Sequence, residues 1–228
     1  MPNDEALPIT VWYDYHCPYS RRAVAWLDGL GRERVVPTLR AFPLEQVNRD
    51  PTAAAWRIWE QPLSYDHYRG RQDRRGLAAF LATEILAAAE TPEVMRRFRE
   101  AVYATRFDRR VDISAPATLA RAAAQAGAGS AGAHGDLLRA ALSDETTLVR
   151  ARRTLAEDWA AARRDWEIFG VPTLQLPGDA PIYLRLEHEP DPGTGAVDLL
   201  RRLVELRATA PFLIELKRPE QVTVEPDR

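Results

Sequence analysis

The sequence is poor in several residue types that would point to particular classes of protein. Among 228 residues there is one cysteine, Cys17, so an intramolecular disulfide is excluded. No apolar run approaches the ~18 residues that cross a bilayer, and residues 1–5 lack the basic and apolar regions of a signal peptide. The formal net charge of −2 favours neither a nucleic-acid nor a membrane partner. We therefore expect a cytoplasmic protein whose thiol stays reduced.

Metal-binding patterns are also missing. The four histidines, His16, His67, His134 and His188, have no ligand spacing, and there is no second cysteine to complete a site. We predict no metal and no permanently bound cofactor.

The single cysteine lies at the junction of a predicted strand and a predicted helix. Residues 8–15 include an apolar run typical of a strand, and apolar residues recur at helical spacing over 18–30. The Cys17 thiol would then lie beside the first free N–H groups of the helix, which favour a thiolate. Pro18 suits the first helical position, where no N–H is needed.

The neighbours of Cys17 define a motif with a hydroxyl where a dithiol enzyme has its second sulfur. Ser20 occupies the last position of the Cys-x-x-Cys pattern. His16 could stabilise a thiolate when protonated, or it could point to solvent. We expect Tyr19 to line the surface of the site. The alternative interpretation of the motif is a buried structural cysteine near a helix start.

The order of predicted elements indicates an α/β, thioredoxin-like fold with a large all-helical insertion after the second strand. Residues 35–42 are a predicted strand, and Pro37 within it favours an edge position. Helical patterns fill residues 49–167, followed by two short strands and a last helix. The predicted units are core halves 8–48 and 168–207, an insertion 49–167 whose last helix packs back on the core, and a C-terminal tail 208–228.

Two local expectations concern the insertion. Ser114 is a candidate cap for a helix over 116–125. The Gly/Ala-rich stretch 127–135 is predicted to be a loop.

The second half of the predicted site is Gly170-Val171-Pro172-Thr173, directly before a strand. In a thioredoxin-like core this loop faces the start of the first helix. A cis bond at Pro172 would turn the backbone of Val171 outward, where it can pair with an extended substrate. The alternative is an ordinary turn proline.

These motifs resemble the DsbA-like thioredoxin family, in the branch of FrnE-type oxidoreductases, kappa-class glutathione transferases and 2-hydroxychromene-2-carboxylate isomerases. The resemblance spans about residues 8–207 and rests on Asp14-Tyr15-His16-Cys17-Pro18-Tyr19-Ser20, Asp112-Ile113-Ser114 and Gly170-Val171-Pro172-Thr173. It implies that Cys17 is the nucleophile, that Pro172 is cis, and that Val171 and Pro172 meet the substrate backbone. FrnE-type members usually have cysteine at the position of Ser20, and the transferases and isomerases usually have serine at that of Cys17. The sequence thus lies between two patterns.

Three reaction cycles remain open. A small thiol such as glutathione or mycothiol could resolve a mixed disulfide at Cys17. Cys17 could instead reduce a peroxide and be restored by a small thiol. Alternatively, the site could activate a bound thiol for transfer or isomerisation. The leading hypothesis is a monothiol thiol-disulfide oxidoreductase acting on a small thiol or a protein disulfide, ahead of a kappa-like transferase or isomerase and a non-catalytic binding module.

Further partner surfaces are suggested by composition. Arg21 and Arg22 could pair with an acidic group of a small thiol. The aromatic and basic stretch 56–75 is a candidate pocket wall, or alternatively a solvated arginine face. A homodimer could form through an apolar tail after Pro211, where the apolar residues are Phe212, Leu213, Ile214 and Leu216.

Overall fold

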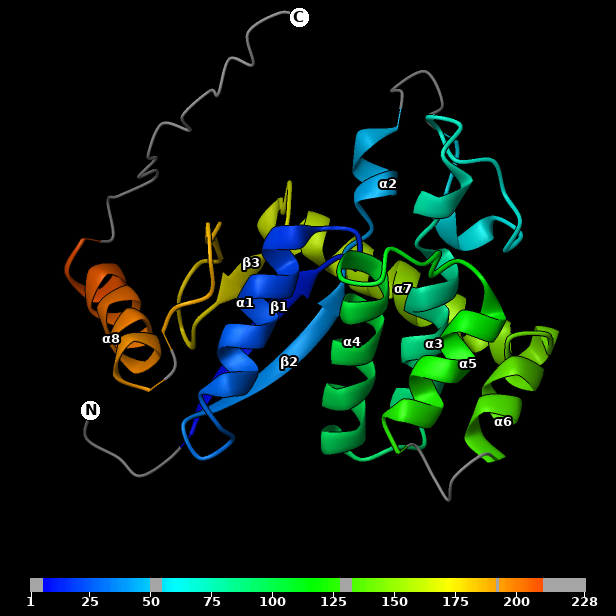
Figure 1. Cartoon of the computed structure of the whole chain (residues 1–228). Coiled ribbons are helices and arrows are strands. Elements are labelled where there is room, and N and C mark those ends of the chain that lie inside the picture. Colours follow the sequence, from blue (N-terminus) through cyan, green and yellow to red (C-terminus); the bar gives the residue numbers. More distant parts are fainter. Residues whose placement is uncertain (1–5, 50–54, 128–132, 192, 211–228) are drawn as a thin grey trace, which may run out of the picture.

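The structure, a computed structural model, describes residues 6–49, 55–127, 133–191 and 193–210. Its centre is a mixed sheet in the order β2-β1-β3-β4 (Figure 1). The strands are β1 (Leu7–Tyr13), β2 (Val35–Ala41), β3 (Thr173–Gln175) and β4 (Ile182–Tyr183). β1 runs parallel to β2, to which helix α1 (Pro18–Gly29) connects it, and antiparallel to β3. Pro37 lies on the edge strand, as predicted, because an edge strand tolerates a missing N–H on its free side.

The chain between β2 and β3 is mostly helical. Figure 1 shows α3, α4, α5 and α6 gathered beyond the β2 edge of the sheet, and α8 on the opposite side. This arrangement confirms the predicted thioredoxin-like fold with a helical insertion. The remaining elements are α2 (Leu44–Asn48), the 3-10 helices η2 (Ile58–Glu60) and η3 (Gln72–Arg74), α3 (Leu77–Ala87), α4 (Pro92–Phe107), α5 (Pro116–Gln125), α6 (Ala133–Ala141), α7 (Glu145–Trp166) and α8 (Thr194–Thr209).

The insertion shares a hydrophobic core with the sheet. Leu77, Phe80 and Leu81 of α3 are fully buried, as expected for a helix that is apolar on nearly every face. The long helix α7 returns to the sheet, where Trp159 stacks on Phe42 with ring centroids 4.6 Å apart. The thioredoxin-like part and the insertion therefore hold each other in place.

One local prediction in the insertion is wrong, and a second is wrong at its C-terminal end. Helix α5 has Ala115 at its N-cap and no side-chain cap, because the helix begins one residue after the predicted cap. The N–H and hydroxyl of Ser114 both donate to the Asp112 carboxylate. These bonds form an Asx-type turn that holds Ser114 outside the helix. Gly135 lies inside α6 rather than in a loop, and residues 128–132 lie outside the described residues.

The tail after Pro211, with the predicted dimer surface, also lies outside the described residues. Within the described part, no helix has both the length and the apolar character needed to cross a bilayer.

Candidate active site

The fold brings Cys17 and the loop before β3 together across 154 residues of sequence. Cys17 is the N-cap residue of α1, and its Sγ accepts a hydrogen bond from the Ser20 N–H at 3.4 Å. The same thiol donates to the Val171 carbonyl at 3.4 Å, and the Val171–Pro172 peptide bond is cis. Thr173 Oγ1 closes this loop by donating to the Gly170 carbonyl at 2.7 Å.

The ionisation of Cys17 differs from the expectation. Its side chain is only 5% exposed, and this burial raises the pKa of the thiol. The Ser20 hydroxyl and N–H act in the opposite direction, but they do not outweigh desolvation. The N–H groups at the helix start thus favour the thiolate, as predicted, but burial has the larger effect, so that the net result is a raised pKa of the Cys17 thiol.

Asp14 shapes the segment that carries the thiol, and sequence reasoning gave it no role. Its carboxylate accepts hydrogen bonds from the His16 N–H at 2.6 Å and from the Leu44 N–H at 2.7 Å. These bonds end β1 at Tyr13 and tie the cysteine turn to the start of α2. Burial raises the pKa of Asp14 to about 6, despite the two backbone N–H donors. An aspartate three residues before a lone cysteine is the signal that could have identified it.

His16 does not carry the positive charge that its predicted role requires. Burial lowers the pKa of its imidazole to about 3, so the ring is neutral at pH 7. Its Nδ1 accepts a hydrogen bond from Nε of Arg106 at 2.9 Å, and its Nε2 is buried without a hydrogen-bond partner in the described part of the chain. The fixed positive charge beside the cysteine segment therefore belongs to Arg106, on α4.

The rim of the site is formed by Pro18, Tyr19 and the chain after β4. Pro18 is exposed and Tyr19 is half-buried. The Arg185 guanidinium lies over the Tyr19 ring at 4.1 Å and donates to its hydroxyl. Arg22 lies over the same ring at 5.4 Å and donates to the Leu186 carbonyl. The Tyr19 ring therefore contacts two guanidinium groups.

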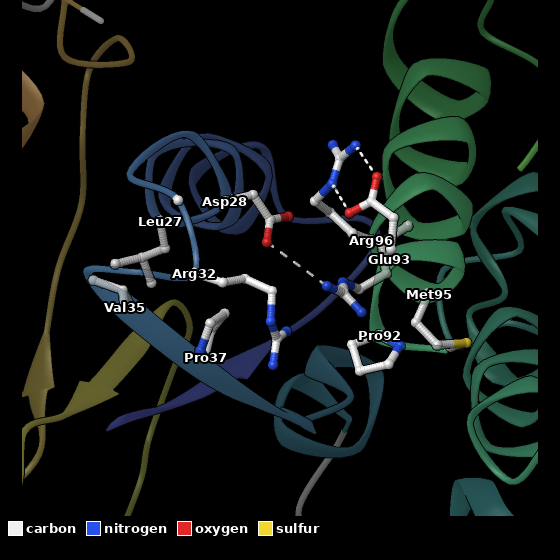
Figure 2. Close-up of a pocket in the computed structure, with 11 residues that line it drawn as sticks. Leu27, Asp28, Arg32, Val35, Pro37, Pro92, Glu93, Met95 and Arg96 are labelled. Carbon is white, nitrogen blue, oxygen red and sulfur yellow. Dashed lines mark hydrogen bonds and ion pairs between the residues drawn. The ribbon is translucent and has the colours of Figure 1, made fainter. Parts of the chain in front are cut away.

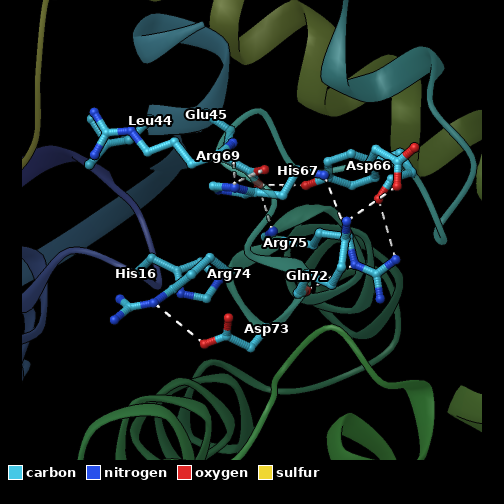
Figure 3. A network of polar contacts seen from close by, with 12 residues as sticks. His16, Leu44, Glu45, Asp66, His67, Arg69, Gln72, Asp73, Arg74 and Arg75 are labelled. Carbon is cyan, nitrogen blue, oxygen red and sulfur yellow. Dashed lines mark hydrogen bonds and ion pairs between the residues drawn. The ribbon is translucent and has the colours of Figure 1, made fainter.

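The predicted pocket wall 56–75 is tied to the core by a buried carboxylate. Glu45 Oε2 accepts hydrogen bonds from the Tyr65 hydroxyl at 2.5 Å and from the Gly76 N–H at 2.7 Å. Its other oxygen lies 3.6 Å from His67 Nε2 (Figure 3). Burial raises the pKa of Glu45 to about 7. The segment between Tyr65 and Gly76 is therefore fixed at both ends by one side chain.

A hollow lies at the end of α1 that is remote from Cys17. It is lined by residues of α1, of the connection to β2, of β2 and of α4, which include Asp28, Arg32 and Arg96 (Figure 2). Because α1 has 12 residues, this hollow is separated from Cys17 by about 18 Å along the helix. It contains none of the predicted site residues. The described residues hold no group of three or more histidine, cysteine, aspartate or glutamate side chains that could bind a metal.

A parallel pair of strands joined by a helix, an antiparallel third strand and a cysteine facing a cis-prolyl loop define a thioredoxin-fold protein. A family model described as the DSBA-like thioredoxin domain matches residues 8–188, and the chain belongs to this family. No curated protein matches the sequence.

Solved structures share the fold at low sequence identity. A probable DsbA oxidoreductase from Streptomyces coelicolor is 16% identical, with a TM-score of 0.56 and 97% of each chain covered. The thiol-disulfide oxidoreductase MdbA from Actinomyces oris is 14% identical, with a TM-score of 0.55, over 86% of this chain and 80% of its own. The cytosolic disulfide reductase DsbM from Pseudomonas aeruginosa, solved with GSH, is 17% identical, with a TM-score of 0.53, over 87% of this chain and all of its own.

Proposed function

We propose that the protein is a monothiol thiol-disulfide oxidoreductase in which Cys17 is the nucleophile and a low-molecular-weight thiol resolves the intermediate. The observation that carries the proposal is the position of Cys17 Sγ, at the start of α1 and opposite the Val171 carbonyl. Ser20 occupies the resolving position with a hydroxyl, and the sequence has no other cysteine. The second sulfur must therefore come from another molecule.

The cycle consists of two exchange steps. The Cys17 thiolate attacks the glutathione sulfur of a mixed disulfide, forming a Cys17–glutathione disulfide and releasing the substrate as a thiolate that takes up a proton. A second glutathione thiolate attacks the bound glutathione sulfur, releasing oxidised glutathione and the Cys17 thiolate. The net reaction reduces the substrate disulfide and oxidises glutathione, and Cys17 returns to its starting state.

The electrostatics of Cys17 favour reduction of substrates over their oxidation. A strongly oxidising thioredoxin-fold enzyme stabilises its thiolate, which makes its reduced form more stable. Burial instead raises the pKa of Cys17, so the Cys17 thiolate that is released when its disulfide is reduced gains no such stabilisation. This direction suits a reductase in a cytoplasm rich in small thiols, and the similar DsbM structure is described as a cytosolic disulfide reductase with GSH.

The substrate contacts follow from the same geometry. In the proposed cycle the Val171 carbonyl, which accepts from the Cys17 thiol in the resting protein, accepts instead from an amide N–H of the bound disulfide once the thiolate forms. Pro172 and Thr173 hold that loop, and Pro18 and Tyr19 form the opposite side of the entrance. The thiolate that forms during attack retains the Ser20 N–H as a donor.

The test is intact-mass spectrometry after incubation with oxidised glutathione and then with excess reduced glutathione. We expect one glutathione adduct on Cys17 that the reduced thiol removes. Cys17→Ala should abolish both the adduct and turnover, whereas Ser20→Ala should only weaken them. Turnover that persists without Cys17, or conjugation of glutathione to an electrophile that survives Cys17→Ser, would replace this proposal with the transferase or isomerase function.

A further inference from the structure

A group of guanidinium groups lies beside the cysteine segment and is incompletely neutralised. Arg106 donates to His16, the residue before Cys17. Arg74 lies near the same imidazole (Figure 3). The Asp73 carboxylate lies 3.6 Å from Arg74 and 3.4 Å from Arg71, so that it forms ion pairs with both arginines. Asp112 also interacts electrostatically with Arg106, but its two oxygens accept hydrogen bonds from Ser114.

Most other arginines around the site are occupied by protein partners. Arg21 forms a bidentate pair with Asp108, at 2.6 and 2.8 Å. Arg22 donates to the Leu186 carbonyl, and Arg75 donates to Gln72, Tyr65 and Ser114. These contacts occupy both terminal nitrogens of Arg21 and one terminal nitrogen of Arg22, the pair expected from the sequence.

Arg74 and Arg106 differ because they retain unused donors. Arg106 is only 8% exposed, yet within the described residues its two terminal nitrogens make no hydrogen bond. Arg74 Nε is buried without a hydrogen-bond partner there, as is Nε2 of His16 beside it. The buried Nε of Arg74 is costly to leave unpaired. The two guanidinium groups also repel each other, which lowers the pKa of Arg106 further after burial. An anion bound between them would satisfy the donors and relieve the repulsion.

We propose that Arg74 and Arg106 form a subsite for a carboxylate of the small thiol whose sulfur reacts with Cys17. This inference rests on the monothiol function proposed above and names the class of its cosubstrate, an acidic peptide-like thiol rather than a neutral sugar thiol such as mycothiol. Arginine suits this role because its planar donors match the two oxygens of a carboxylate.

The distances permit one molecule to reach both places. Nε of Arg106 lies within about 10 Å of the Cys17 Cα. This upper limit is the sum of the Cα–Cα spacing between Cys17 and His16, the length of the His16 side chain and the 2.9 Å hydrogen bond from Arg106. An extended tripeptide spans about 10 Å. A tripeptide thiol with its sulfur on Cys17 can therefore extend a terminal carboxylate to the guanidinium groups.

The experiment compares two disulfides that differ in charge. The rate of Cys17 adduct formation is measured by quenched-reaction mass spectrometry with oxidised glutathione, which carries carboxylates, and with bis(2-hydroxyethyl) disulfide, which carries none. We expect Arg74→Gln and Arg106→Gln each to slow the reaction with oxidised glutathione about tenfold, the loss of one charge-assisted hydrogen bond. The rate with the neutral disulfide should change less than twofold.

Arg97→Gln is the matched control, because it removes an exposed guanidinium from the same helix near its other end. It should leave both rates unchanged. If Arg106→Gln slows both disulfides equally, the arginine acts only by positioning His16, and the carboxylate subsite is refuted. Rates with oxidised glutathione that do not depend on Arg74 or Arg106 refute it as well, while leaving the monothiol function intact. Failure of wild-type Cys17 to react with either disulfide overturns the proposed function itself.

Discussion

The buried carboxylate of Glu45 leads to a quantitative prediction about stability. Glu45→Gln retains an oxygen that can accept from Tyr65 and Gly76, while the new amide replaces the oxygen that accepts no hydrogen bond in the described structure. The substitution therefore removes the titrating charge and preserves the two hydrogen bonds. We expect the variant to gain stability relative to the wild type as the pH rises.

The size of the gain follows from the pKa of Glu45. Its value is about 7 in the folded protein and about 4.3 in an unfolded chain. Because the folded pKa is the higher one, the protonated carboxyl stabilises the fold below about pH 4, and this contribution is lost as the pH rises through 7. Between pH 5 and pH 8 the linkage amounts to about 2.5 kcal/mol. Asp14 and Glu84 also have raised pKa values, but they are present in both proteins and cancel in the comparison.

The assay is urea unfolding followed by tryptophan fluorescence, since the chain has six tryptophans. The free energy of unfolding is measured at pH 5, 6, 7 and 8 for the wild type, Glu45→Gln and the control Glu60→Gln, which alters an exposed glutamate. The difference between Glu45→Gln and the wild type should grow by about 2.5 kcal/mol towards pH 8. A constant difference at all four values would refute the assignment of a proton to Glu45 near neutral pH.

Two further predictions concern the thiol and a helix cap. The rate of Cys17 alkylation by iodoacetamide, measured against pH, should have its midpoint above the pH of ~8.5 found for a free cysteine, because burial raises the pKa of the thiol. Ser20→Ala should move this midpoint still higher. A wild-type midpoint below about pH 8.5 would contradict the prediction. Asp144→Ala should cost about 1 kcal/mol of unfolding free energy in urea, because its carboxylate accepts from the Thr147 N–H at 2.8 Å, whereas Asp144→Asn should cost less; equal losses in the two variants would argue against the cap.

The local features of the fold could be predicted from sequence because short-range chemistry determines them. The strand before Cys17, the helix after Pro18 and the edge position of Pro37 all follow from periodicity and from the missing N–H of proline. The α7 cap at Asp144 is likewise a short-range contact, made to the Thr147 N–H three residues further on. By contrast, Ser114 is not the cap of α5, because the helix begins at Pro116 with Ala115 as its N-cap and Ser114 belongs to a turn with Asp112.

The electrostatics of the site could not be predicted in the same way. Whether Cys17 is a thiol or a thiolate depends on desolvation by distant segments, which no local pattern reveals. The same holds for His16, whose neutral ring depends on burial and on Arg106, 90 residues away. The role of Asp14 likewise depends on a distant residue, because its carboxylate accepts from the N–H of Leu44, 30 residues along the chain, at 2.7 Å.

The long sequence separation between Cys17 and Val171 has a consequence for the newborn chain. The hydrogen bond between them spans 154 residues, and β3, which supplies the neighbouring strand, is translated after the whole insertion. At ordinary rates of synthesis the ribosome needs about 10–30 s to cover that distance. Throughout that interval the thiol lacks the loop that buries it and is open to oxidants and to other thiols. Because the sequence has no second cysteine, no incorrect intramolecular disulfide can form in the incomplete chain during this period.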